Sequence, residues 1–248
     1  MAKTSNIIEV RNFAMNFGSK QVIKDLNFEV HRGETFGFLG SNGSGKTTTL
    51  RALLGIYEPT KGELLIDGVP YDVAGKTTIG YLPEERGLYK KENVIDTMVY
   101  FGELKGMTRN DARNFSLKYL KKVGLSENVK TRVDKLSGGM QQKVQLGITI
   151  MGDPELLILD EPTKGFDPVN RRLLLDIILD CQKRGATIMM VSHQMADVEK
   201  LCNRILLLKD GGAVEYGTLA SVRKKYGGKH MEDIFVEVYG GVNGEDEK

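Results

Sequence analysis

The chain has 248 residues, and its 40% of hydrophobic residues supply enough apolar side chains for a sizeable core, which excludes a disordered chain. Its 35 Lys and Arg residues nearly balance 33 Asp and Glu residues. The net charge of +2 gives no electrostatic reason to expect direct binding of nucleic acid or of an anionic membrane surface.

The N-terminal part of the chain is predicted to form an antiparallel β subdomain. Two β-rich runs within residues 7–30 meet at the polar turn 18–20, and Leu26, Phe28 and Val30 alternate with polar residues. A period of two places these three side chains on one face of a strand. We therefore expect a hairpin with one buried face.

Short apolar runs follow the hairpin and predict buried strands. They lie at residues 35–39, 64–66, 79–82, 156–159, 188–191 and 205–208. Helical spacing separates several of them, at residues 48–54, 171–182 and 195–201. Continuously apolar strands that alternate with helices are typical of an α/β fold, with a largely parallel sheet and helices on both of its faces.

An α-helical insert is predicted at about residues 90–150. Its apolar side chains recur at spacings of three and four residues: Val94, Met98, Phe101 and Leu104, then Phe115, Leu117, Leu120 and Val123. We expect residues 1–240 to form a single domain that contains this insert. Residues 241–248 are polar and glycine-rich, and we expect a flexible tail there.

The sequence predicts a cytoplasmic protein. Residues 1–9 lack the apolar run of a signal peptide, and no stretch reaches the roughly 20 apolar residues that cross a bilayer. Cys181 and Cys202 stand far from CxxC spacing, which favours small core residues in a reducing compartment over a disulfide.

One segment, named here the phosphate loop, satisfies the pattern G-x-x-x-x-G-K-[ST] between a predicted strand and a predicted helix: Gly40, Ser41, Asn42, Gly43, Ser44, Gly45, Lys46 and Thr47. Glycines let backbone N–H groups turn toward an anion, and the start of the helix adds partial positive charge. Lys46 then reaches the β- and γ-phosphates of ATP, the Thr47 hydroxyl binds Mg²⁺, and Thr48 completes the candidate ATP-binding set. A glycine-rich turn with an incidental lysine is the alternative, which the strand and helix on either side disfavour.

A second segment, residues 156–162, is an apolar strand that ends in two adjacent carboxylates, Asp160 and Glu161. Ligands bind at the carboxyl edge of a parallel sheet, which favours a Walker B segment. Successive residues point to opposite sides, so Asp160 can bind Mg²⁺ while Glu161 polarises the attacking water. Alone, the pattern would more often be a strand followed by a solvated turn. In a sequence that also contains the phosphate loop, the pattern is a specific sign of a Walker B segment.

A third segment, residues 136–141, named here the signature segment, lies between the other two and has the sequence Leu-Ser-Gly-Gly-Met-Gln. Ser137 and the amides of Gly138 and Gly139, at the start of a helix, form a second candidate anion site. An ordinary capped helix would open in the same way.

With these three segments in order, the sequence resembles ATP-binding cassette (ABC) transporter ATPases over about residues 7–226. The resemblance implies a P-loop NTPase core, ATP and Mg²⁺ as cofactors, and a dimer with a second copy or with another ABC ATPase. In such a dimer Ser137, Gly138, Gly139 and Gln141 of one chain close over ATP held by the phosphate loop of the other. It also implies integral membrane transporter subunits as partners, and a peripheral place on the cytoplasmic face of the cell membrane.

The resemblance assigns roles to further residues. His193 matches the switch histidine that contacts the γ-phosphate, and it joins Lys46 and Glu161 as a candidate catalytic residue. Phe17 matches the aromatic residue that stacks on adenine, with core packing as the alternative. Glu84 stands where the family usually has a glutamine facing Mg²⁺; a carboxylate can still bind the metal but adds negative charge.

Residues 163–167 resemble the family's D-loop, with Lys164 and Phe166 as departures and Asp167 retained, so we expect its dimer contact to survive. Residues 80–89 and 230–238 resemble the ATPase subunits of ABC-2-type exporters, which favours export; the transported substrate is left open. The alternative class is a soluble ABC ATPase that acts as a nucleotide-dependent switch on a macromolecular partner.

Overall fold

The computed structural model describes residues 5–71, 78–85 and 87–240. Its contacts divide the chain into two compact units: unit 1, of residues 1–77 and 187–248, and unit 2, of residues 78–186. The single domain over residues 1–240 stays a prediction, and the tail expected at residues 241–248 lies outside the described residues. Within the described ranges, no helix is both long and apolar enough to span a bilayer.

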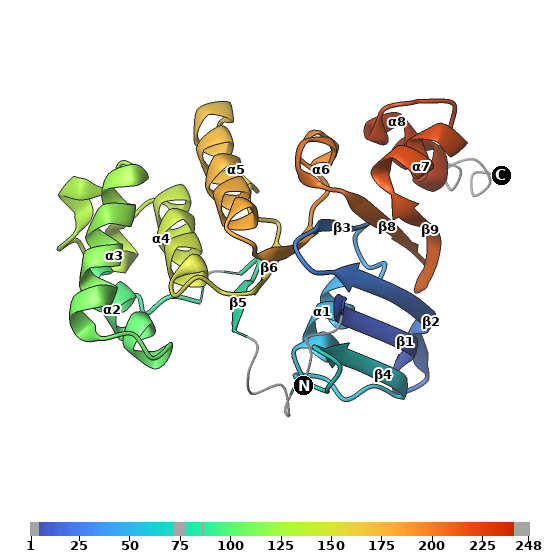
Figure 1. Ribbon diagram of the computed structural model, residues 1–248, viewed down its shortest axis with the longest axis horizontal. Coiled ribbons are helices and arrows are strands. Elements are labelled where there is room, and N and C mark those ends of the chain that lie inside the picture. Colours follow the sequence, from blue (N-terminus) through green and yellow to red (C-terminus); the bar gives the residue numbers. More distant parts are fainter. Residues whose placement is uncertain (1–4, 72–77, 86, 241–248) are drawn as a thin grey trace. The chain divides into compact units, whose positions relative to one another are not determined.

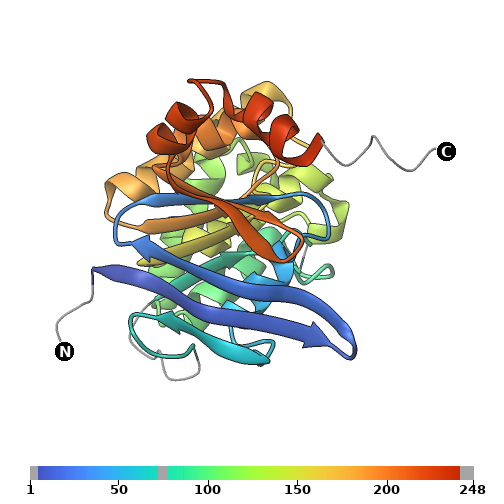
Figure 2. The same ribbon diagram turned by 90° about the vertical axis from the view of Figure 1, so that its right-hand side faces the viewer.

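An antiparallel sheet in unit 1 confirms the predicted hairpin. Its order is β2-β1-β4, with β1 at Asn6–Phe17, β2 at Lys20–His31 and β4 at Lys61–Ile66. Figure 2 shows the long hairpin of β1 and β2 in blue, with β4 in teal beside β1. The alternating side chains of β2 are buried, as predicted.

Parallel strands form the second layer of unit 1. β3 (Thr35–Gly40) lies between β7 (Thr187–Val191) and β8 (Arg204–Lys209) and is parallel to both. β3 and β7 are buried along their whole length, as strands covered on both faces should be. β9 (Gly212–Thr218) pairs antiparallel with β8 and was not predicted, because two glycines and the lack of a buried face hide it.

The helices of unit 1 include two that sequence periodicity predicts and two that it does not. α1 (Lys46–Leu53) and α6 (Met195–Leu201) are the predicted ones, whereas α7 (Leu219–Lys225) and α8 (Met231–Tyr239) are additional. Figure 1 shows α7 and α8 beside β8 and β9. The Tyr239 hydroxyl donates to the Leu208 carbonyl oxygen at 2.9 Å, which fastens α8 to β8.

Among the described residues of unit 2, a pair of parallel strands is combined with four helices. β5 (Ile79–Leu82) pairs with β6 (Leu156–Asp160), and two 3₁₀ turns lie at Ser126–Asn128 and Val133–Lys135. The helices are α2 (Val94–Leu104), α3 (Arg109–Lys122), α4 (Gly138–Ile150) and α5 (Pro168–Lys183). α2, α3 and α4 lie together, which confirms the predicted helical insert (Figure 1).

The buried face of α3 corrects one detail of the prediction. Leu117 was expected on the apolar face but is 38% exposed, while Tyr119 is buried. A Cβ atom on Gly147 of α4 would lie 2.4 Å from the Tyr119 ring, so the glycine leaves room for the ring. The Tyr119 hydroxyl donates to the Lys143 carbonyl oxygen at 2.7 Å. This close packing, and not the leucine spacing, sets the rotation of α3.

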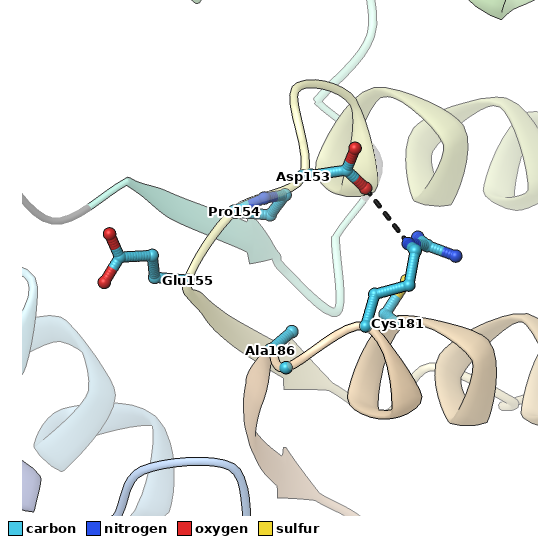
Figure 3. A pocket seen from close by; sticks show the side chains of 7 residues that line it. Asp153, Pro154, Glu155, Cys181 and Ala186 are labelled. Carbon is cyan, nitrogen blue, oxygen red and sulfur yellow. Dashed lines mark hydrogen bonds and ion pairs between the residues drawn. The ribbon is translucent and has the colours of Figure 1, made fainter.

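Both cysteines are buried free thiols, as predicted. Cys181 on α5 borders a small cavity of about 100 Å³ in unit 2 (Figure 3). Burial raises the pKa of the Cys181 thiol, and Arg184 donates to its sulfur at 3.3 Å while also bonding to Asp153. A buried thiol with a raised pKa is a poor nucleophile, so Cys181 is a packing residue.

Candidate functional site

The phosphate loop connects β3 to α1 within unit 1. Gly45 has φ +110°, and a Cβ atom there would lie 2.3 Å from Cδ1 of Ile23. A Cβ atom on Gly40 would lie 2.5 Å from Oγ of Ser44. Side chains at these two positions would clash, so the narrow cradle of backbone N–H groups depends on both glycines.

Donor groups converge on this loop. The Lys46 ammonium group donates to the carbonyl oxygens of Gly40 and Ser41, both at 2.8 Å, so Lys46 folds back over the loop. The start of α1 has no side-chain cap. Within the described part of the chain, the buried Ser44 Oγ has no hydrogen-bond partner. Uncapped N–H groups, a buried hydroxyl and an ammonium group suit a phosphate chain.

The remaining residues of the predicted set lie on the rim of the loop. Ser41, Asn42, Gly43 and Thr47 are exposed, and Thr48 is half-buried in the first turn of α1. The Thr47 hydroxyl is therefore accessible to a ligand bound in the loop.

His193 lies at the same sheet edge as the phosphate loop. Phe38 of β3 pairs with Val191 of the parallel strand β7. Gly40 comes two residues after Phe38, and His193 comes two residues after Val191. The carboxyl ends of parallel strands form the edge at which ligands bind. His193 is exposed there, and its contact to phosphate stays a prediction.

Phe17 is 45% exposed at the end of β1, which excludes the alternative of core packing. Its ring meets Tyr57 edge-on, with centroids 5.3 Å apart and an interplanar angle of 79°. A T-shaped pair leaves at least one face of the Phe17 ring clear of Tyr57, and stacking of that face on a base stays a prediction.

The two acidic residues of the second segment lie in unit 2. Asp160 ends β6 and is buried, and Glu161 follows it with only 7% exposure. Glu161 has φ +51°, a left-handed conformation that is uncommon for a residue with a side chain. Such backbone strain is concentrated at functional sites, where the surroundings maintain it.

The signature segment forms the start of α4. Ser137 is the N-cap, and its Oγ accepts from the Met140 amide at 3.3 Å. Gly138 and Gly139 are the first helical residues, and the Gln141 side chain donates to the Leu136 carbonyl oxygen at 3.0 Å. Within one chain, the segment is thus a capped helix; its anion-binding role stays a prediction.

The opposite end of α4 is fixed by Lys105. Its ammonium group donates to the carbonyl oxygens of Ile148, Thr149 and Met151 at 2.6, 2.9 and 3.2 Å. A cation at a helix C-terminus satisfies free carbonyls and complements the helix dipole. Lys105 therefore holds the helix whose other end carries the signature segment.

Two departures from the family pattern contact each other. The Lys164 ammonium group lies 2.6 Å from Oε1 of Glu84. The hydrogen bond and charge of Glu84 raise the pKa of Lys164, and the carboxylates of Glu161 and Asp160 act in the same direction. The sequence shows Lys164 only as a substitution, because its partner lies 80 positions away. The extra negative charge expected at Glu84 is therefore compensated.

A second residue that sequence patterns miss is Gln142. Its side-chain amide donates to the carbonyl oxygens of Glu161 at 3.3 Å and Pro162 at 3.1 Å.

Asp167, predicted as a dimer contact, caps α5 by accepting from the amides of Val169 and Asn170. The dimer contact itself stays a prediction.

The residues predicted to bind a metal carry oxygen atoms, the ligand type that Mg²⁺ prefers. The described residues contain no cluster of three His, Cys, Asp or Glu side chains that could hold a metal alone. Mg²⁺ is usually held by one or two protein oxygens together with substrate phosphates. The Thr47 hydroxyl of unit 1 and the Asp160 carboxylate of unit 2 are each an oxygen donor of that kind, and their binding of one shared ion stays a prediction.

Comparisons with known proteins agree with these motifs. The family model described as "ABC transporter" matches residues 23–164. An ABC transporter ATP-binding protein of Methanocaldococcus jannaschii is 44% identical over 218 residues, covering 88% of this chain and 80% of that protein. The linearmycin resistance ATP-binding protein of Bacillus subtilis is 33% identical, covering 96% and 76%. The Nod factor export ATP-binding protein I of Paraburkholderia xenovorans is 34% identical, covering 92% and 76%.

A solved structure is also similar. It is titled as the structure of an ATP binding subunit of an ABC transporter, with a TM-score of 0.87 and 27% sequence identity. The match covers 94% of this chain and 99% of that one. The likeness thus extends over both units.

Proposed function

The chain belongs to the ABC transporter family, as an ATP-binding subunit, and we propose that it hydrolyses Mg-ATP to drive a separate membrane-spanning exporter subunit. The observation that carries this proposal is the phosphate loop, where Lys46 and the orphaned Ser44 hydroxyl surround a cradle of backbone N–H groups. The buried Glu161 beside Asp160 supplies the group that hydrolysis needs in addition to binding.

ATP binding is assigned to unit 1. The N–H groups of the phosphate loop and the Lys46 ammonium bind the phosphates, and Phe17 stacks on the adenine ring. Thr47 and Asp160 would hold Mg²⁺, with Glu84 facing it through its carboxylate. When bound, the ion neutralises phosphate charge.

Hydrolysis is assigned to Glu161 and His193. Glu161 accepts a proton from water as the water oxygen attacks the γ-phosphorus. The bond from the γ-phosphorus to the β–γ bridging oxygen breaks, and ADP leaves with that oxygen. His193 donates a hydrogen bond to the γ-phosphate and orients the water.

The signature segment gives the proposal its dimer. It is an additional helix N-terminus that binds no phosphate of its own chain, and a second chain, identical or different, would supply the ATP over which it closes. ATP closes the dimer and hydrolysis opens it. The motion passes to integral membrane subunits from the cytoplasmic face of the membrane. Export is favoured because one similar protein bears the name of an export ATP-binding protein and another the name of a resistance ATP-binding protein.

Purified chain should hydrolyse ATP only with Mg²⁺, and the same chain, tagged in its native cells, should copurify with a polytopic membrane protein. Phosphate release and mass spectrometry of the detergent-solubilised complex measure the two properties. Recovery with a soluble assembly, and with no membrane protein, would replace transport by the nucleotide-dependent switch. ATP binding without hydrolysis in that membrane complex would refute the ATPase proposal.

Lys164→Gln should lower kcat/KM for ATP by roughly 3- to 10-fold, the size of a typical coupling between neighbouring charges. The substitution leaves Glu84 as an uncompensated negative charge near Asp160 and Glu161. Glu84→Gln combined with Lys164→Gln removes both charges and should recover most of the kcat/KM that the single variant loses. A double variant as slow as Lys164→Gln alone would contradict charge compensation. The exposed pair should contribute little to stability, so thermal unfolding serves as the control.

A further inference from the structure

One side chain of α4 holds the backbone that carries the proposed catalytic carboxylate. The Gln142 amide nitrogen has two hydrogens, and it donates to two successive carbonyl oxygens, those of Glu161 and Pro162. Gln142 is half-buried and lies in the second turn of α4, five residues beyond Ser137. Both acceptors belong to the loop that follows β6.

The backbone of this loop needs support. Glu161 is left-handed at φ +51°, which a residue with a Cβ atom adopts only where its surroundings hold it. The Glu161 carbonyl oxygen also accepts from the Lys164 amide at 3.2 Å, which closes a turn within the loop. The Gln142 amide ties this turn to α4 through a side-chain hydrogen bond.

A second contact joins the same two elements. A Cβ atom on Gly139 would lie 3.3 Å from Cε1 of Phe166, so the Phe166 ring packs against the first turn of α4. Gly139 and Gln142 are three positions apart and therefore share one face of the helix. This face of α4 therefore contacts both ends of the loop of residues 161–166.

We propose that Gln142 is a positioning residue that transmits the position of the signature segment to Glu161. It does not touch the substrate. When a second chain's ATP engages Ser137 at the start of α4, the helix moves as a rigid body, and Gln142 carries the peptide groups of Glu161 and Pro162 with it. Glu161 is thereby aligned for water only when the dimer is closed. This proposal rests on the proposed function.

The test is Gln142→Leu, which keeps the side-chain size and removes both N–H donors. We expect kcat for ATP to fall about 10-fold or more, because a small displacement of a catalytic group lowers the rate of the chemical step. KM for ATP should change less than about twofold. The matched control is Lys143→Met, because Lys143 donates to the Val123 carbonyl oxygen at 3.1 Å from the adjacent position of α4. This control should turn over ATP at the wild-type rate. Gln142→Glu, which also lacks donors to carbonyls, repeats the test if the leucine variant misfolds.

A double-mutant cycle separates positioning from general damage to the fold. If Gln142 acts through Glu161, then Gln142→Leu should have no further effect on the residual turnover of Glu161→Gln. Additive losses, or wild-type turnover in both Gln142 variants, would overturn the proposal. Wild type and Glu161→Gln report on the proposed function by themselves: equal turnover of these two would refute the role of Glu161 and the inference with it. A normal loss in Glu161→Gln with none in Gln142→Leu would refute the inference alone.

Discussion

Glu161→Gln should reduce ATP turnover by about 10²-fold or more, while ATP binding stays intact, because an amide cannot accept the proton of the attacking water. The substitution preserves side-chain size, so the left-handed backbone at φ +51° and the bonds from Gln142 should persist. Steady-state phosphate release measures the loss, and a nucleotide-binding titration checks affinity. Size-exclusion chromatography in Mg-ATP should show a dimer that accumulates because its ATP is not consumed.

Glu155→Gln is the matched control for this experiment. Glu155 directly precedes β6, so the substitution makes the same chemical change at the opposite end of the strand from Asp160. Its turnover should equal that of wild type. If Glu161→Gln also kept near-normal turnover, Glu161 would not be the base, and another group would have to accept the proton.

The local structure of the candidate site could be predicted where it is encoded in contiguous residues. The cradle of the phosphate loop depends on Gly40 and Gly45, and the pairing of a buried strand with two carboxylates is visible at Asp160 and Glu161. In these segments local backbone preference and site chemistry coincide, so the residue pattern specifies both. The hairpin of β1 and β2 could also be predicted, because apolar residues that alternate with polar ones along β2 are the residues buried in the structure.

What could not be predicted depends on contacts between distant residues. Glu84 and Lys164 are 80 positions apart, and each alone is only a substitution in a family pattern. Gln142 meets Glu161 across 19 positions, and no spacing rule links them. The face of α3 was misassigned because Tyr119 finds room over Gly147, which only the packed structure can show. Tertiary packing decides such features, and periodicity does not contain them.

Lys46→Met should weaken ATP binding by about 10- to 100-fold, the cost of losing a charge-assisted hydrogen bond to phosphate. The aliphatic side chain keeps most of the volume, so α1 should remain intact while the ammonium group that reaches Gly40 and Ser41 at 2.8 Å is lost. Calorimetric titration with a non-hydrolysable ATP analogue measures the affinity, and Lys61→Met, an exposed lysine of β4 in the same unit, is the control. Unchanged affinity would move the nucleotide site away from the phosphate loop. The expected results differ in kind. Glu161→Gln should bind ATP and close without turnover, whereas Lys46→Met should fail before closure, because the proposed dimer holds ATP between its two chains.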